Sequence, residues 1–202
     1  MKKNLTYFCF LFFIIFYTTN SSANSSDVKN WLKYEIDQII NLYKNDEISA
    51  EVKLNAIKET INKSFAGKSI AKFVVGNKWD EASEEVRENF VELFKEHLSL
   101  TVGSLMQSYS NQKYELIDAT EVKKGLFKID MELTFNEQKT LVTWGVKEHK
   151  NKFYVMDLII ADISLMRAKR SEFSSVLKKK NLKELNIILK DQNLESYNNL
   201  IN

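Results

Sequence analysis

Apolar residues recur at helical spacing along the first half of the chain, and this pattern predicts four helices. In residues 27–43, for example, Trp31, Leu32, Ile36 and Ile39 fall near one stripe. Ser and Gly mark the helix ends, because a Ser side chain caps a first turn and Gly tolerates the backbone that follows a last one. We expect helices over residues 27–43, from a Ser49 cap to a stop at Gly67, over residues 69–75 with a stop at Gly76, and from a Ser83 cap to about Ser110.

Beyond residue 112 the period changes from helical to alternating. In the run GLFKIDMELTF, apolar side chains at Phe127, Ile129, Met131 and Leu133 alternate with polar ones, as in a strand with one buried face. The segment Asn136–Gln138 predicts a short hairpin turn. With KYELIDATEV before this run, and KTLVTWGVKEH and FYVMDLIIA after it, the pattern predicts four antiparallel strands in a meander.

Two further helices follow the strands. One begins at Ser164 and runs through Leu177, and Asn181 caps the last helix, with Glu184 three residues on to complete a capping box. Residues 193–202 are polar, so we expect a frayed tail there. Helices, then strands, then helices predict an α+β fold, in which helices pack on one face of a curved four-stranded antiparallel sheet.

The first 23 residues form a separate segment. The basic start MKKN precedes a dense apolar run from Leu5 to Tyr17, and small residues stand at Ser21 and Ala23. This is the pattern of a cleaved secretory signal, because the apolar run is shorter than the roughly 20 residues of a membrane span. An uncleaved anchor is the alternative. We therefore expect a signal peptide at residues 1–23, one folded domain at 24–192 and a tail at 193–202.

Charge and cysteine content exclude several classes of protein once the signal is removed. Removing Lys2 and Lys3 from the 29 Lys and Arg leaves 27, which equals the 27 Asp and Glu, so no dominant basic field points to nucleic acid. The single Cys, Cys9, lies within the signal, so the mature chain has no disulfide, thiol or cysteine metal chemistry. Hydrophobic residues make up 44% of the chain, which allows a sizeable core.

Candidate catalytic residues are few. Neither His97, on an apolar stripe, nor His149, in a turn, belongs to a nucleophile or metal motif. Asp157 interrupts an apolar strand, and it is either a catalytic acid or, as we favour, a carboxylate bonded to backbone or Arg. Lys178–Lys180 ends a helix, either as a solvated terminus, the simpler interpretation, or as a docking patch for lipid headgroups or an acidic partner. The sequence therefore disfavours an enzyme.

Two segments resemble the MlaC (toluene-tolerance) family of periplasmic phospholipid-binding proteins. The first, IAKFVVGNKWDEASEEVRENFVELFKEHLSLTVGSLMQSY, is similar to that family's pattern of a Gly, a nearby Trp, an Ala-Ser cap and a spaced series of aromatic and aliphatic residues. Its matching positions are Phe73, Gly76, Trp79, Ala82, Ser83, Phe90, Phe94, Leu98, Leu105 and Tyr109. The second, FYVMDLIIADISLMRAKRSEF, matches the family at Asp157, Ser164, Leu165, Arg170 and Phe173.

The chain departs from the family pattern at three places within the resemblance, which covers about residues 27–191. Val102 stands where the family usually has Tyr, Ala161 and Asp162 replace Glu-Gly, and Ala168 and Lys169 replace Asn-Tyr. Because Asp adopts a positive φ less readily than Gly, we expect the turn that precedes the following helix to differ from the family's turn.

The resemblance implies an antiparallel sheet packed on helices, with an apolar ligand pocket between them for acyl chains. It implies a periplasmic carrier, without cofactor or metal, that shuttles phospholipid between an outer-membrane lipoprotein complex and an inner-membrane ABC transporter. Such transport maintains the lipid asymmetry of the outer membrane. Residues 24–192 are then the lipid-binding domain, with acyl chains buried and the headgroup exposed. No catalytic residue is required.

The predicted pocket walls come from the long helix, the alternating strands and the helix after them. Both faces of residues 153–160 are apolar, and we assign the face of Met156, Leu158 and Ile160 to the pocket because Asp157 lies on the other. The predicted lipid-binding residues are Phe73, Trp79, Phe90, Phe94, Leu98, Val102, Leu105, Tyr109, Phe127, Ile129, Met131, Leu133, Val142, Trp144, Met156, Leu158, Ile160, Leu165 and Phe173.

One alternative of a different class stays open. It is a secreted α+β interaction module, or a carboxylate-dependent enzyme, with a solid core. Composition does not separate a filled core from a hollow one, since the 13 Phe, 8 Tyr and 3 Trp serve either.

Overall fold

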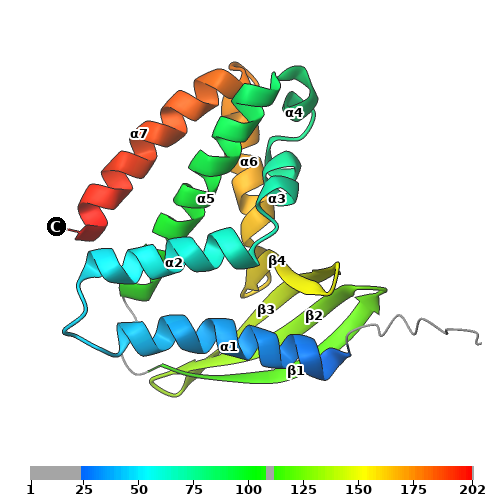
Figure 1. Ribbon diagram of the computed structural model, residues 1–202, viewed down its shortest axis with the longest axis vertical. Coiled ribbons are helices and arrows are strands. Elements are labelled where there is room, and N and C mark those ends of the chain that lie inside the picture. The colour runs from blue at the N-terminus through cyan, green and yellow to red at the C-terminus, as the bar shows by residue number, and fades with distance from the viewer. Residues whose placement is uncertain (1–23, 108–111, 202) are drawn as a thin grey trace, which may run out of the picture.

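The structure is a computed structural model that describes residues 24–107 and 112–201. Within these ranges the chain has the predicted α+β fold, with seven helices and one antiparallel sheet (Figure 1). The helices are α1 (Ser25–Tyr43), α2 (Ala50–Ser64), α3 (Gly67–Val75), α4 (Lys78–Glu81), α5 (Glu84–Gln107), α6 (Leu165–Leu177) and α7 (Leu182–Ile201). The strands are β1 (Lys113–Lys123), β2 (Leu126–Phe135), β3 (Gln138–His149), β4 (Lys152–Ile160) and β5 (Ile163–Ser164). The predicted signal peptide lies outside the described residues.

The sheet is a meander in the order β1-β2-β3-β4-β5, and every neighbouring pair is antiparallel. The prediction of four strands is therefore wrong by one, because β5 is only two residues long and leaves no periodic signal in the sequence. The β4–β5 turn contains Ala161 and Asp162, with φ angles of 47° and 66°. The chain thus makes a left-handed turn without Gly, in a conformation that costs a non-Gly residue about 1–2 kcal/mol.

Side-chain caps begin the helices where the sequence predicts them. The hydroxyls of Ser49, Ser83 and Ser164 accept hydrogen bonds from backbone N–H groups three residues on, at 3.4, 3.4 and 3.1 Å. Asn181 and Glu184 form a reciprocal capping box, with both hydrogen bonds at 3.0 Å. These caps satisfy N–H groups that a first turn leaves without a helical partner.

The predicted helix stop at Gly67 is wrong, whereas the stop at Gly76 is confirmed. Helix α2 already ends at Ser64, because Phe65 turns into an extended conformation and forms a bridge with Val155 of β4. Gly67 is instead the first residue of α3. Gly76 ends α3 with a φ of 62°, a backbone conformation that Gly adopts without steric cost.

The predicted frayed tail is also wrong, because α7 continues to Ile201. Asn193 is 3% exposed, and its Nδ2 donates to the backbone oxygen of Leu93 at 2.8 Å. Leu200 is 7% exposed and packs with Leu54 and Leu100. The other described polar residues of this segment are exposed or half-buried, so its polar composition hides a helix that is held along its length.

Two large clusters of buried apolar residues fill the fold, beside the small cluster of Leu54, Leu100 and Leu200. The helical core lies among α2, α3, α5, α6 and α7 and contains Phe90, Phe94 and Phe173, whose ring centroids are 5.6 to 5.9 Å apart. The sheet core lies between α1 and the strands β1, β2 and β3 and contains Leu32 and Phe127. In Figure 1, α1 lies along the sheet while α5, α6 and α7 rise away from it. The helices therefore cover the sheet unevenly.

Replacing Leu200 with Ala tests whether the end of α7 is part of the fold. We expect the free energy of unfolding to fall by about 2–5 kcal/mol, since the change leaves a cavity beside α2 and α5. Leu194→Ala is the matched control, because Leu194 is 62% exposed and its loss should change stability by no more than about 0.5 kcal/mol. Urea unfolding measures both, and equal stability of the two variants would mean that the end of α7 is frayed.

Candidate functional site

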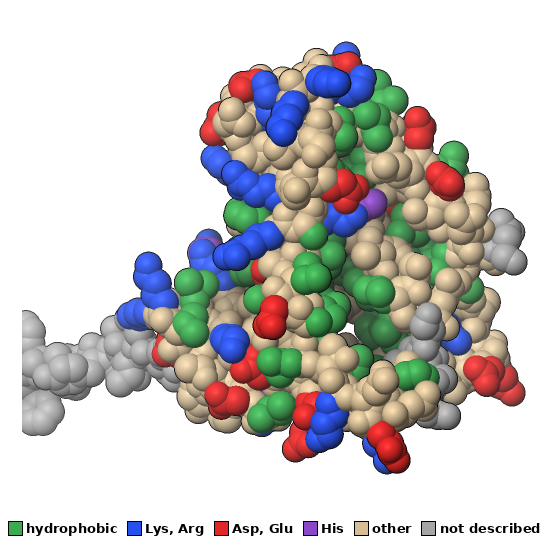
Figure 2. Space-filling model, turned by 180° about the vertical axis from the view of Figure 1, so that it is seen from behind, with side chains coloured by type: hydrophobic (Ala, Val, Ile, Leu, Met, Phe, Trp, Pro, Cys, Tyr) green, Lys and Arg blue, Asp and Glu red, His purple; other side chains and the backbone are tan. Residues whose placement is uncertain are grey.

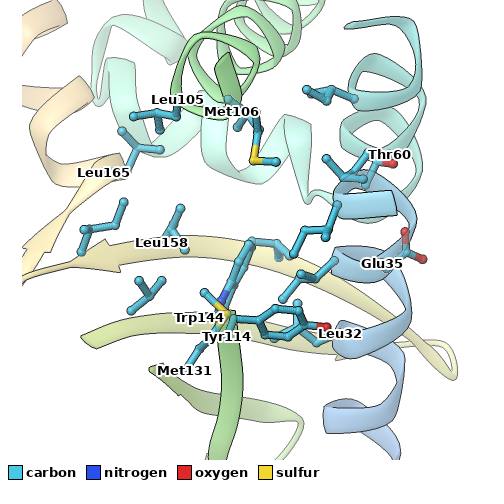
Figure 3. Close-up of a pocket in the computed structure, with 18 of the residues that line it drawn as sticks. Leu32, Glu35, Thr60, Leu105, Met106, Tyr114, Met131, Trp144, Leu158 and Leu165 are labelled. Atoms are coloured by element: carbon cyan, nitrogen blue, oxygen red, sulfur yellow. The ribbon is translucent and has the colours of Figure 1, made fainter. Parts of the chain in front are cut away.

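A cavity of about 480 Å³ lies between the two cores. Its walls come from α1, α2, the second half of α5 and the strands β1 to β4, with Leu165 at the start of α6 (Figure 3). Residues of both cores line it, such as Ile61 and Leu98 from the helical core and Leu32 and Met131 from the sheet core. The cavity is therefore the gap along which the two cores do not meet.

Helical spacing and strand pairing bring many of the predicted residues to this cavity. Leu98, Val102 and Leu105 follow one another at four and three residues, on one face of α5. Met131 of β2 pairs with Val142 of β3, which pairs in turn with Ile160 of β4, so the three form one row of the sheet. The predicted residues that line the cavity are Leu98, Val102, Leu105, Met131, Leu133, Val142, Trp144, Leu158, Ile160 and Leu165.

The other predicted residues lie elsewhere. Trp79, Phe90, Phe94 and Phe173 belong to the helical core, and Phe127 and Ile129 to the sheet core. Phe73 is 42% exposed on the surface of α3. Tyr109 lies outside the described residues. Most of the large aromatic rings that the sequence offers as pocket lining therefore fill the two cores on either side of the cavity.

A β-bulge decides which residues of β4 face the cavity. Gly145 pairs with Asp157 and Val146 with Val155, so Met156 is an extra residue on β4. Strict alternation breaks at this point. Val155 on one side of the bulge and Leu158 and Ile160 on the other line the cavity, and Met156 does not.

The sequence prediction misses the whole wall formed by α1 and α2. The apolar stripes of these helices are visible in the sequence, but a stripe that faces a cavity has the same residue types as one that faces a core. The lining residues missed are Leu32, Glu35, Ile36, Ile39, Ile40, Ile57, Thr60, Ile61, Ser64, Phe65, Met106, Gln112, Tyr114, Thr140 and Val155.

Two acidic side chains at these walls are engaged away from the cavity, whereas the Ser64 Oγ and the Trp144 Nε1 are buried without a hydrogen-bond partner. Glu35 is 8% exposed and forms an ion pair with Lys63 at 3.2 Å, and in Figure 3 its carboxylate points away from the cavity. The Tyr114 hydroxyl donates a hydrogen bond to the Asp37 carboxylate. Burial raises the pKa of Asp37, but hydrogen bonds from Lys33 and Tyr114 outweigh burial, and the net pKa is lowered. The surface left to a ligand is largely apolar.

Asp157 joins the sheet to α6. Its Oδ1 accepts hydrogen bonds from the N–H groups of Leu158 at 2.8 Å and Met166 at 3.1 Å, and its Oδ2 accepts from the Ser164 hydroxyl at 2.6 Å. Three hydrogen bonds satisfy a carboxylate inside an apolar strand, as the structural interpretation of this residue expects. We call this set of contacts the Asp157 junction.

Arg170 joins α6 to α3 in a similar way. Its Nη1 donates to the backbone oxygen of Phe73 at 2.5 Å, and its guanidinium lies 4.8 Å from the centroid of the Phe73 ring. A Cβ at Gly76 would approach the Nη2 of Arg170 to 3.2 Å. The two segments that carry the family resemblance therefore meet here, and they fix the helices to one another.

His97 is 9% exposed and connects α5, α6 and α7. Its Nε2 lies 2.8 Å from the Lys169 Nζ, and its Nδ1 lies 3.1 Å from the Asn193 Oδ1. Because an ammonium group only donates, Nε2 accepts and the ring carries its proton on Nδ1. Burial, and then the charge of Lys169, lower the pKa of His97 below its usual 6.5, while Asn193 and Glu172 act in the opposite direction. The neutral imidazole has a structural role here.

The described residues lack two other kinds of feature, a metal site and a membrane-spanning helix. Residues 24–107 and 112–201 contain no group of three or more His, Cys, Asp or Glu side chains placed to hold a metal ion. Over the same ranges, no helix combines the length and the apolar character needed to cross a membrane.

Comparisons with known proteins point to one family. The family model described as MlaC protein matches residues 34–191 of the chain. Among solved structures, the chain is similar to the phospholipid-binding protein from Ralstonia solanacearum in complex with a phospholipid. The sequence identity is 16%, the match covers 87% of this chain and 99% of that chain, and the TM-score is 0.73, so the likeness shows a shared fold. No curated protein matches the chain.

The lowered pKa of His97 predicts that stability falls as the solution becomes more acidic than pH 6.5. Above this pH the imidazole is neutral in both states, whereas below it the unfolded chain takes up a proton that the folded protein resists. Thermal unfolding of the wild type and of His97→Gln between about pH 7.5 and pH 5 checks this. The variant should lose less stability over that range. His149→Gln, at the exposed last residue of β3, is the control for removal of a His, and parallel curves for all three proteins would contradict the prediction.

Proposed function

The chain belongs to the MlaC family, and we propose that it binds a phospholipid in the cavity between its two cores. The observation that carries this proposal is the apolar lining of a cavity whose volume, about 480 Å³, lies within the roughly 300–1,000 Å³ of ligand sites. A similar fold, that of the Ralstonia solanacearum protein, is known in complex with a phospholipid.

The chemistry of a phospholipid suits this cavity. Each CH₂ group moved from water into an apolar site contributes about 0.8 kcal/mol, so acyl chains gain far more from these walls than a headgroup does. Side chains such as Leu32, Met131, Leu158 and Met106 offer hydrocarbon and sulfur surfaces rather than paired polar groups (Figure 3). Leu105 lines the cavity and is 56% exposed, which places it at the opening. We therefore assign the acyl chains to the cavity and the headgroup to solvent.

The wider role in this proposal is transport. A diacyl lipid with some tens of CH₂ groups loses on the order of 20 kcal/mol on entering water, so it needs a carrier between two membranes. The protein then works in the periplasm and passes phospholipid between an outer-membrane lipoprotein complex and an inner-membrane ABC transporter, which maintains outer-membrane lipid asymmetry. The amino-terminal segment, with its secretory pattern, supports this location. Carrying a lipid breaks no covalent bond, so the proposed function is not an enzymatic one.

Lipid analysis of the purified protein tests the proposal. Full-length protein directed to the periplasm should yield bound phospholipid after organic extraction, measured as lipid phosphorus per mole of protein. A stoichiometry near zero after exposure to phospholipid vesicles would overturn the proposed function. Two competitors show which part of the lipid is recognised. If the acyl chains are recognised, a large excess of soluble phosphoglycerol headgroup should leave the bound phospholipid in place, and free acyl chains should displace it.

Met131→Trp should block loading, because a bulky indole in the row of Val142 and Ile160 occupies the space assigned to acyl chains. The matched control is Leu141→Trp, at a 47% exposed position of β3 on the opposite face of the sheet. Circular dichroism and thermal unfolding establish that both variants fold. We expect most of the bound phospholipid to be lost from the Met131 variant and retained by the control. Equal loading of two folded variants would place the lipid elsewhere.

A further inference from the structure

The proposed function leaves one strongly basic surface unexplained. Between residues 163 and 183 the sequence has seven Lys or Arg and one acid, Glu172. That acid is already paired with Lys169, at 2.9 Å, and Lys180 pairs with Glu184, directly beyond this segment, at 3.3 Å. A local excess of this size is unusual in a chain with 29 Lys and Arg and 27 Asp and Glu overall, so the opposite excess lies elsewhere in the sequence.

The cations of this segment follow one exposed face of α6. Arg167, Arg170, Ser174 and Lys178 are spaced at three, four and four residues, which places them on one side of a helix, and all are exposed. Ser171 and Ser175 lie beside them and are exposed as well. We call this surface, together with Lys179 and Lys180, the basic face. It extends for about 20 Å, at a rise of about 1.5 Å per residue.

Exposed apolar side chains flank the basic face near the cavity. Ile163, directly before α6, is 67% exposed, and Phe73 of α3 lies against Arg170 and is 42% exposed. Leu165, the first residue of α6, lines the cavity. Figure 2, which views the molecule from behind, shows blue side chains gathered at its upper end and continuing down one edge. The basic face thus runs from the cavity wall to the far end of the helical core.

We propose that the basic face docks the protein on an anionic phospholipid surface. Clusters of four to eight Lys and Arg attract anionic headgroups, and exposed apolar side chains beside them insert into the boundary between headgroups and acyl chains. The small serines between the cations leave room for headgroups to approach. This inference rests on the proposed function, because docking through this face brings the Leu165 end of the cavity to a membrane that holds the ligand.

A lipid surface fits these observations better than an acidic protein does. The basic face lies along one side of a single helix and the residues that follow it, and all of its charges stand at the ends of long Lys and Arg side chains. Ile163 and Phe73 are single apolar side chains at its border, as expected for shallow insertion, rather than a contiguous apolar centre of a protein interface. The contact should be weak, reversible and sensitive to salt.

Vesicle binding of charge variants tests the proposal. The test variant combines Lys178→Gln, Lys179→Gln and Lys180→Gln, and the control combines Lys123→Gln, Lys124→Gln and Lys147→Gln, which remove the same charge from exposed positions at the far ends of β1 and β3. Each protein is sedimented with vesicles of phosphatidylcholine and with vesicles that also contain phosphatidylglycerol. We expect the partition coefficient of the test variant on anionic vesicles to fall by roughly 100-fold, and that of the control by much less.

The outcomes separate docking from lipid loading. The proposal is supported if the wild type binds only to vesicles that contain phosphatidylglycerol, if salt weakens this binding, and if the test variant loses it while the control variant keeps it. Equal binding of the two variants, or no binding of the wild type to anionic vesicles, would overturn it, and an acidic protein partner would then be the occupant to seek. Both variants keep every cavity residue, so they should retain bound phospholipid. Loss of phospholipid from all three proteins would instead count against the proposed function.

Discussion

The cavity exists because two close-packed cores are fixed to each other along one border and diverge beyond it. Protein interiors normally pack without voids of this size, so the walls must be held apart by rigid neighbours. The Asp157 junction ties β4 to α6, and the bridge between Phe65 and Val155 ties α2 to the same strand. Away from β4, α1 stays with the sheet while α5 stays with the helices, and the space between them remains open.

This arrangement explains where the most recognisable residues of the sequence lie. Trp79, Phe90, Phe94 and Phe173 do not line the cavity but make the helical core solid, and Arg170 fastens α6 to α3. These aromatic residues and the Arg of the family pattern therefore build the scaffold that keeps the cavity open. Among the described residues of that pattern, only Leu98, Leu105 and Leu165 line the cavity, and the rest of its surface comes mostly from aliphatic residues of many elements outside the pattern, such as Ile36, Ile61 and Leu158.

Much of the fold was predictable because it follows from contacts between residues close in the sequence. The features that the sequence did not predict depend on packing between distant segments. Caps at Ser49, Ser164 and Asn181 and the alternation of β2 are short-range signals that the structure confirms. The bulge at Met156, the two-residue β5 and the end of α7 depend on contacts with distant segments, so no local pattern reveals them. For the same reason only ten of the 25 lining residues that the structure describes were predicted, since an apolar stripe on α1 or α2 does not show whether it faces side chains or a ligand.

The central claim is that acyl chains occupy the gap between the two cores. Photocrosslinking tests it most directly, with a phospholipid that carries a photoreactive group near the end of one acyl chain and with mass spectrometry of the labelled peptides. The account predicts labels on peptides from α1, α2 and the cavity-facing positions of β2 and β3, around Ile36, Ile61 and Met131. Labels confined to the outer face of the sheet or to α7 would contradict it.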